Sequence, residues 1–177
     1  MISWSKIALD VICMVVAGSA GLGITHQLRE AIMQEASLSV EEASQRFYLI
    51  DKAGLITESI ARQTRLRKGL ADFVRADSEW IDVKKEEGGA IRLLEVVKKV
   101  KPTVLIGTST HGGAFTKEVV TAMSESVDRP IIFPLSNPSR LVEVDPKDAN
   151  DWSGERGLLA TGSPFPAVKM KNGKQYQ

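Results

Sequence analysis

An apolar run that leads into a cluster of glycines is the feature that most constrains how this chain can fold. Val11–Val16 is a continuous apolar stretch, and Gly18, Gly21 and Gly23 follow it directly. From Leu22 onward the apolar residues recur at helical spacing. This pattern predicts a central parallel strand that passes through a tight turn into a helix.

The same segment can also be interpreted as the end of a secretory signal peptide. Lys6 and an apolar stretch over residues 7–16 precede the small residues, as in such peptides. Asp10 interrupts that stretch, however, and a carboxylate there opposes insertion. The single cysteine, Cys13, permits no internal disulfide, and we expect it to be a small buried apolar residue. We therefore favour the strand and turn, and expect a protein of the cytoplasm or mitochondrial matrix that is not secreted.

Composition indicates an ordinary globular domain without a strong electric field. The chain has 177 residues, of which 43% are hydrophobic and 25% charged, and a net charge of +1. No apolar stretch approaches the roughly 20 residues that span a bilayer. We therefore expect no nucleic acid and no membrane among its partners.

Strands and helices alternate along the whole sequence. This order predicts an α/β fold of the Rossmann type, a doubly wound, mainly parallel sheet with helices on both faces. Besides residues 11–16, the predicted strands are 47–51, 103–107, 130–135 and 158–161. The predicted helices begin at Leu22, at Ser39 in a capping box with Glu42, at Gly89 and at Thr116. Residues 57–85 are expected to form a solvated, partly helical excursion.

The carboxyl ends of parallel strands meet at one edge of such a sheet, where ligands bind. A glycine turn that opens a helix leaves backbone amides free for a phosphate, so Gly18, Ser19, Ala20 and Gly21 are candidate phosphate-binding residues. Asp51 ends the second strand, where a carboxylate can accept hydrogen bonds from an adenosine ribose and repel a 2′-phosphate. This favours NAD over NADP, and a plain strand-end turn is the alternative.

Other polar residues fall at the same edge. Asn137 stands between Ser136 and Pro138 and can bind a substrate carboxylate or a nicotinamide ribose, although an Asn-Pro pair can simply begin a turn. His111 has no identifiable carboxylate partner, and His26 is expected to pack or lie exposed. The sequence contains no set of residues with the spacing of metal ligands.

Six stretches together resemble the NAD-binding domain of the malic enzymes. They are GSAGLGI at 18–24, YLIDKAGL at 48–55, KPTVLIGTS at 101–109, GGAFT at 112–116, RPIIFPLSNP at 129–138 and ATGSPF at 160–165. The resemblance places an atypical first strand in residues 1–16, the domain in 17–173 and a tail in 174–177. It implies oxidative decarboxylation of malate to pyruvate and CO₂ with NAD, or less favourably NADP, and with Mg or Mn.

The resemblance also assigns roles to individual residues. Gly18–Gly21 would cradle the cofactor phosphates, Asp51 would meet the adenosine ribose, and Ser109 would line the cofactor cleft. Asn137 would reach both the nicotinamide and malate. No residue of this chain is expected to be catalytic or to bind metal, because the family's catalytic tyrosine, catalytic lysine and metal-binding carboxylates lie upstream of the glycine turn.

Two departures from the family pattern shape our expectations. Val16 stands where the family turn begins with glycine, and a β-branched residue resists a positive φ, so weakened cofactor binding is expected. The chain also corresponds to an internal piece, which we expect to be inactive alone, with assembly as a homo-oligomer or with a full-length subunit as open alternatives. A non-catalytic dinucleotide-binding or interaction module, a non-functional remnant and a different NAD-dependent dehydrogenase are the alternatives.

Overall fold

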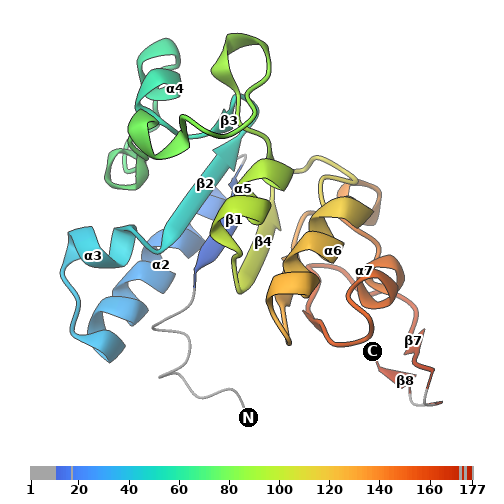
Figure 1. Cartoon of the computed structure of the whole chain (residues 1–177). Helices are drawn as coiled ribbons and strands as arrows, with labels where there is room; N and C mark the ends of the chain where they lie inside the picture. The colour runs from blue at the N-terminus through green and yellow to red at the C-terminus, as the bar shows by residue number, and fades with distance from the viewer. Residues whose placement is uncertain (1–10, 17, 172, 174, 177) are drawn as a thin grey trace.

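The structure is a computed structural model that describes residues 11–16, 18–171, 173 and 175–176, with the side chains of 13–16 and 176 left out. A six-stranded sheet in the order β3-β2-β1-β4-β5-β6 forms its centre (Figure 1). Every neighbouring pair is parallel except β2 and β3. The chain therefore winds outward from β1 in both directions, as the sequence predicts for a doubly wound sheet.

Strands, α-helices and 3₁₀ turns follow one another along the chain from residue 12 onward. The strands of the sheet are β1 (Ile12–Val16), β2 (Phe47–Asp51), β3 (Gly54–Leu55), β4 (Val104–Thr108), β5 (Ile131–Pro134) and β6 (Leu158–Leu159). A separate antiparallel pair is formed by β7 (Val168–Lys169) and β8 (Gln175–Tyr176). The α-helices are α2 (Ser19–Ala36), α3 (Val40–Ser44), α4 (Glu58–Gln63), α5 (Leu93–Val100), α6 (Lys117–Ser126) and α7 (Pro146–Trp152), and the 3₁₀ turns are η1 (Ala71–Phe73), η2 (Asp77–Trp80), η3 (Glu87–Gly89) and η4 (Ser139–Leu141).

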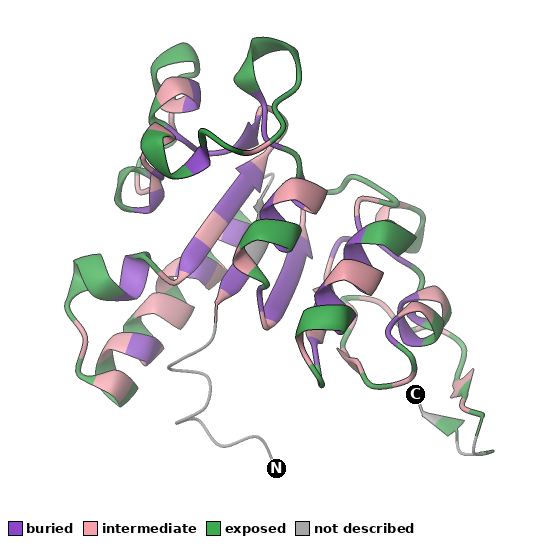
Figure 2. Ribbon diagram, viewed as in Figure 1, coloured by how far each residue is buried: buried purple, intermediate pink, exposed green. Residues whose placement is uncertain are grey.

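The two faces of the sheet are covered by different helices. Along β4, Leu105 packs into a cluster with residues of α5, α6 and α7, whereas Val104 and Ile106 pack into a second cluster with residues of α2 and α3. Successive side chains of a strand point to opposite faces, which produces this division. Figure 2 shows the strands as the buried layer between the helices. The predicted fold class is confirmed.

Local signals in the sequence set several helix boundaries. The expected capping box forms at α3, where the Ser39 hydroxyl accepts a hydrogen bond from the Glu42 amide at 3.2 Å and the Glu42 carboxylate accepts one from the Ser39 amide at 2.9 Å. The hydrogen bonds from Ser39 also hold the pKa of the Glu42 carboxyl below its usual value. Thr116 is the N-cap of α6, and its hydroxyl accepts a hydrogen bond from the Val119 amide.

The excursion over residues 57–85 is more ordered than the sequence predicts. It contains α4, η1 and η2, and Arg75 is buried against Tyr48, with its guanidinium 4.5 Å from the ring centroid. A bridge between Thr57 and Arg75 joins two parts of the excursion, and the Arg75 amide donates a hydrogen bond to the Ile56 carbonyl at 3.0 Å, next to β3. Within the described residues, none of the helices is long and apolar enough to cross a membrane.

Some expectations fall on residues that the structure leaves undescribed. Residues 1–10, which carry the signal-peptide alternative, lie outside the described part, as does the Cys13 side chain. Within the expected tail, the backbone of Gln175 and Tyr176 pairs with β7. The domain limits at 16, 17 and 173 stay predictions.

Candidate functional site

The turn between β1 and α2 lies where the strand order of the sheet reverses. Gly18 is the N-cap residue of α2, with an extended backbone and no side chain that caps the helix. A Cβ atom placed on Gly18 would meet no atom of the described residues within 4 Å, so among these residues the space beside Gly18 is open. Ser19 and Ala20 are exposed, and Gly21 is buried. The first amides of a helix have no partner within it, so this terminus can bind an anion.

Helix α2 differs in this respect from most helices of the described part. A side-chain oxygen of Ser39, Thr57, Thr116 or Asp145 caps α3, α4, α6 or α7, and α5 has Glu95 in its first turn. The described first turn of α2 contains no acidic residue. Its positive dipole end therefore faces the open space without a negative side chain of its own.

Val16 is an extended strand residue rather than a turn residue. It ends β1, and its backbone pairs in register with Thr108 of β4. Strand residues have a negative φ, which a β-branched residue adopts readily. The expectation that position 16 needs a positive φ, and hence a glycine, is therefore wrong.

Asp51 ends β2, which is the neighbour of β1 in the sheet. One carboxylate oxygen accepts a hydrogen bond from the Lys52 amide at 2.8 Å, and the other lies 3.0 Å from an Arg67 guanidinium nitrogen. Both side chains of this ion pair are partly exposed. Arg67 belongs to residues 57–85, which the sequence predicts to be a solvated excursion, and only folding brings it to Asp51.

A cavity of about 880 Å³ opens between the ends of β2 and β4. Asp51 and Lys52 line it on one side, and the loop 109–111 after β4 lines it on the other. The first residues of α5 complete its wall. The structure thus brings Asp51 and Ser109, which are 58 positions apart in the sequence, to a single cavity.

Ser109 borders this cavity, but its hydroxyl faces inward. The residue is 8% exposed, and its hydroxyl donates to the Glu143 carboxylate at 3.0 Å. The Ser109 amide donates to the same oxygen at 2.9 Å. Its contribution to the cavity is therefore the shape of the loop rather than a free hydroxyl.

Asn137 lies after β5, exposed at the same sheet edge. Its amide nitrogen donates to the Leu135 carbonyl at 3.4 Å, and its amide oxygen accepts a hydrogen bond from Ser163. Gly162 makes this approach possible, because a Cβ atom there would lie 2.4 Å from the Leu135 carbonyl oxygen. A second cavity, of about 890 Å³, borders Gly162 and Ser163.

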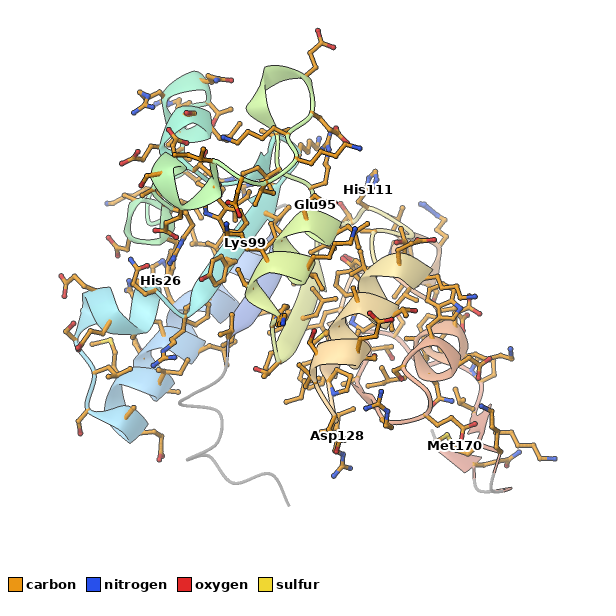
Figure 3. All side chains as sticks on the ribbon, in the orientation of Figure 1. His26, Glu95, Lys99, His111, Asp128 and Met170 are labelled. Carbon is orange, nitrogen blue, oxygen red and sulfur yellow. The ribbon has the colours of Figure 1, made fainter. Side chains whose placement is uncertain are left out.

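The two histidines differ in their surroundings. His111 is exposed at the wall of the first cavity, where Figure 3 shows it beyond the end of the sheet. His26 packs within α2, with its ring 5.5 Å from that of Phe73, as the sequence suggests. Among the described residues, no group of three or more His, Cys, Asp or Glu side chains could hold a metal ion.

Glu143 is the residue of this region that sequence reasoning missed. It is fully buried, between the loops that follow β4 and β5. The only signal in the sequence is an acid placed between two apolar residues, Val142 and Val144. Such a pattern does not separate a buried carboxylate from an exposed one.

Fold and site together define a class of protein. A doubly wound sheet with an open helix N-terminus at its switch point is a Rossmann-type domain. A family model described as the NAD binding domain of malic enzyme matches residues 2–177. The chain belongs to this family.

Curated relatives agree with the family model. NAD-dependent malic enzyme 3 of Bacillus subtilis (strain 168) is 47% identical over 161 residues, which are 90% of this chain and 28% of that protein. Malolactic enzyme of Leuconostoc mesenteroides is 43% identical over 155 residues, 88% of this chain and 27% of that protein. The chain therefore spans little more than a quarter of the length of these relatives.

A solved structure shares the fold. The NAD-dependent malic enzyme of Thermotoga maritima aligns over 92% of this chain and 36% of its own, with a TM-score of 0.60 and 21% sequence identity. At that identity the likeness concerns the fold alone.

Proposed function

We propose that this chain binds NAD, and NADP more weakly, as the dinucleotide-binding part of a malic enzyme that oxidatively decarboxylates malate to pyruvate and CO₂. The observation that carries the proposal is the open, uncapped N-terminus of α2, which has Asp51 on one side and Asn137 on the other. Strands β2 and β5 are three positions apart in the sheet, which corresponds to about 14 Å. That separation suits the two nucleosides of an extended dinucleotide on either side of its pyrophosphate.

Each part of the edge has a role in this proposal. The amides of Ser19, Ala20 and Gly21 donate to the pyrophosphate, and Gly18 leaves room for it. Asp51 accepts hydrogen bonds from the adenosine ribose, and Asn137 binds the nicotinamide ribose or the substrate carboxylate. The nicotinamide ring, when bound, accepts a hydride from the substrate.

The surroundings of Asp51 support a preference for NAD rather than exclusion of NADP. Its carboxylate would repel a 2′-phosphate, but Lys52 follows it and Arg67 pairs with it at 3.0 Å. An exposed ion pair of this kind contributes about 0–1 kcal/mol and can rearrange. The Arg67 side chain can therefore turn toward the 2′-phosphate of NADP, which permits weaker binding of NADP.

Calorimetry of the pure chain with NAD⁺ and NADP⁺ tests the proposal. We expect the lower Kd for NAD⁺. Asp51→Asn should raise that Kd about tenfold, as expected for the loss of charged hydrogen bonds, and should narrow the difference between the cofactors. Asp128→Asn is the matched control. Asp128 also pairs with an arginine, Arg156, but it is fully exposed and lines the second cavity, which borders Gly162 and Ser163.

The alternatives predict other results. Binding of NAD⁺ that Asp51→Asn leaves unchanged would contradict the role of Asp51. The absence of heat and of a thermal shift at millimolar cofactor would favour a non-functional remnant. Binding by a chain that never contributes to turnover, even beside a full-length subunit, would favour a non-catalytic module.

We also propose that malate turnover needs residues outside this chain. The Mg or Mn of the family finds no donor set among the described residues, so no step is assigned to it here. Assembly as a homo-oligomer, or with a full-length subunit, is a further proposal that sedimentation of the pure chain and of mixtures would test.

A further inference from the structure

A fully buried carboxylate at the functional edge has no part in the function proposed above. Glu143 is 0% exposed and follows η4, on the segment that leads to α7. Its carbonyl oxygen accepts a hydrogen bond from the Phe115 amide at 3.0 Å. The Val142 carbonyl accepts one from the Gly113 amide at 3.1 Å. The backbone is thus fixed beside the loop that follows β4.

The carboxylate receives four hydrogen bonds from two serines. One oxygen accepts from the Ser109 amide at 2.9 Å, from the Ser109 hydroxyl at 3.0 Å and from the Ser136 hydroxyl at 2.5 Å. The other oxygen accepts from the Ser136 amide at 3.3 Å. All four donors are uncharged. A buried carboxylate without a cation depends on such donors, so these contacts must be kept for the charge to stay buried.

Both serine hydroxyls also accept hydrogen bonds from backbone amides of the loop 109–111. The Ser109 hydroxyl accepts from the His111 amide at 3.1 Å, and the Ser136 hydroxyl accepts from the Thr110 amide at 2.8 Å. One carboxylate therefore sets the backbone of residues 109–111 directly and through these hydroxyls. It joins that loop to residue 136, which immediately precedes Asn137.

The sequence provides space for this arrangement. A Cβ atom on Gly107 would lie 2.4 Å from the carboxyl carbon of Glu143 and 2.6 Å from its Cγ. Contacts that short do not occur between real side chains, so any other residue at 107 would displace the carboxylate. Gly107 lies within β4, where a glycine otherwise weakens a strand. Its presence there is explained by the close approach of Glu143.

We propose that Glu143 is a positioning residue for the cofactor cleft. Its carboxylate holds the loop 109–111, which lines the cavity beside Asp51, in register with the loop 136–138, which carries Asn137. The inference rests on the proposed binding of NAD. It adds that the two ends of the cofactor are held by loops that a single buried charge joins.

Glu143→Gln tests the arrangement selectively. A glutamine can keep its oxygen toward the three donors that now share one carboxylate oxygen. Its NH₂ group then faces the Ser136 amide, and two donors oppose each other. The loop 109–111 should therefore keep its position, while residues 136–137 should move.

The expected result is a split between two ligands. In Glu143→Gln, the Kd of NAD⁺ should rise about tenfold, whereas the Kd of ADP, which lacks the nicotinamide and its ribose, should change little. The measurement is calorimetry at a temperature where each variant is fully folded. The control is Glu125→Gln, which alters an exposed glutamate of α6.

A purely structural role would give a different result. It would lower the melting temperature and leave both Kd values of the folded protein unchanged, which would overturn the proposal. An equal loss of both ligands would also overturn it. So would an effect on NAD⁺ with none on NADH, because the charge itself rather than the loop position would then be responsible.

A measurement without ligand separates this proposal from that of NAD binding. In Glu143→Gln, hydrogen exchange of the Ser136 amide should accelerate at least about tenfold, while that of the Ser109 amide should stay slow. If the wild-type chain binds no NAD⁺, the proposed function fails but this test still applies. Unchanged exchange at Ser136 would contradict the inference.

Ser136→Ala is a second, milder variant for the case in which Glu143→Gln does not fold. It removes one donor to Glu143 and the acceptor of the Thr110 amide, but leaves the carboxylate in place. We expect faster exchange at the Thr110 amide and a rise of less than about tenfold in the Kd of NAD⁺. Protection of that amide equal to the wild type would contradict the proposed joining of the two loops.

Discussion

Val16 ends a central strand at the point where the chain enters the glycine turn. Its backbone pairs with Thr108, so an extended conformation is required of it and a positive φ is not. Val16→Gly should therefore leave the Kd for NAD⁺ unchanged. It should lower the free energy of unfolding by about 1 kcal/mol, because glycine loses more backbone entropy in a strand. Urea unfolding and calorimetry measure the two quantities, and a clearly tighter Kd in Val16→Gly would show that the turn needs the glycine.

Individual residues also show what could be predicted from the sequence. The capping box of Ser39 and Glu42 and the open turn at Gly18 depend on neighbours along the chain, and both form as predicted. The ion pair of Asp51 with Arg67 and the burial of Glu143 depend on residues that meet only in the folded chain. The spacing of residues along the chain contains no information about such long-range contacts, so they could not be predicted.

Several short elements were not predicted from the sequence. Helix α7 was missed, although Asp145 caps it and Pro146 occupies its first turn, a combination typical of a helix start. Strand β3 has only two residues and pairs antiparallel to β2. It is too short to show alternation in the sequence. In the excursion, the sequence around α4 shows charge but no clear periodicity, and α4 is fixed by hydrogen bonds that Ser59 donates to Asp77 of η2.

The start of α4 depends on a carboxylate that is distant in sequence. Asp77 accepts hydrogen bonds from the Ser59 hydroxyl at 2.5 Å, the Ser59 amide at 3.2 Å and Arg62 at 3.1 Å. The Ser59 hydroxyl has the largest effect in holding the pKa of the Asp77 carboxyl below its ordinary value of 3.8. The ionised form is therefore stabilised by folding.

This gives a pH-dependent prediction for the element. Because the folded pKa is lowered, the contribution of Asp77 is fully present above the unfolded pKa and is lost as the pH falls through the folded pKa. Asp77→Asn should cost about 1–2 kcal/mol at neutral pH. The difference from the wild type should shrink as the pH falls below 3.8. Urea unfolding across this range measures it, with the fully exposed Asp128→Asn as control. A difference that is independent of pH would contradict the assignment.

At the scale of the whole molecule, the proposed dinucleotide site consists of two loops and one helix terminus. The α2 terminus lies at the switch point of the sheet, Asp51 lies toward the β2 side, and Asn137 toward the β5 side. This arrangement follows from the strand order, so the predicted fold class was enough to expect these candidate residues on one edge of the sheet. The chain nevertheless spans only 28% of the length of a relative such as NAD-dependent malic enzyme 3.

The last prediction concerns what this domain can do by itself. The described residues offer groups for a cofactor but no cluster of three or more side chains that could hold a metal ion. We therefore predict that the pure chain, mixed with malate, NAD⁺ and Mn²⁺, forms no NADH, as measured by NADH fluorescence. NAD⁺ at a hundred times its Kd should still stabilise the folded chain by about 2.7 kcal/mol, which raises the Tm by about 5–10 °C. The shift in Tm is the control that shows a folded, binding-competent chain. Sustained formation of NADH would mean that the domain contains a catalytic group of its own.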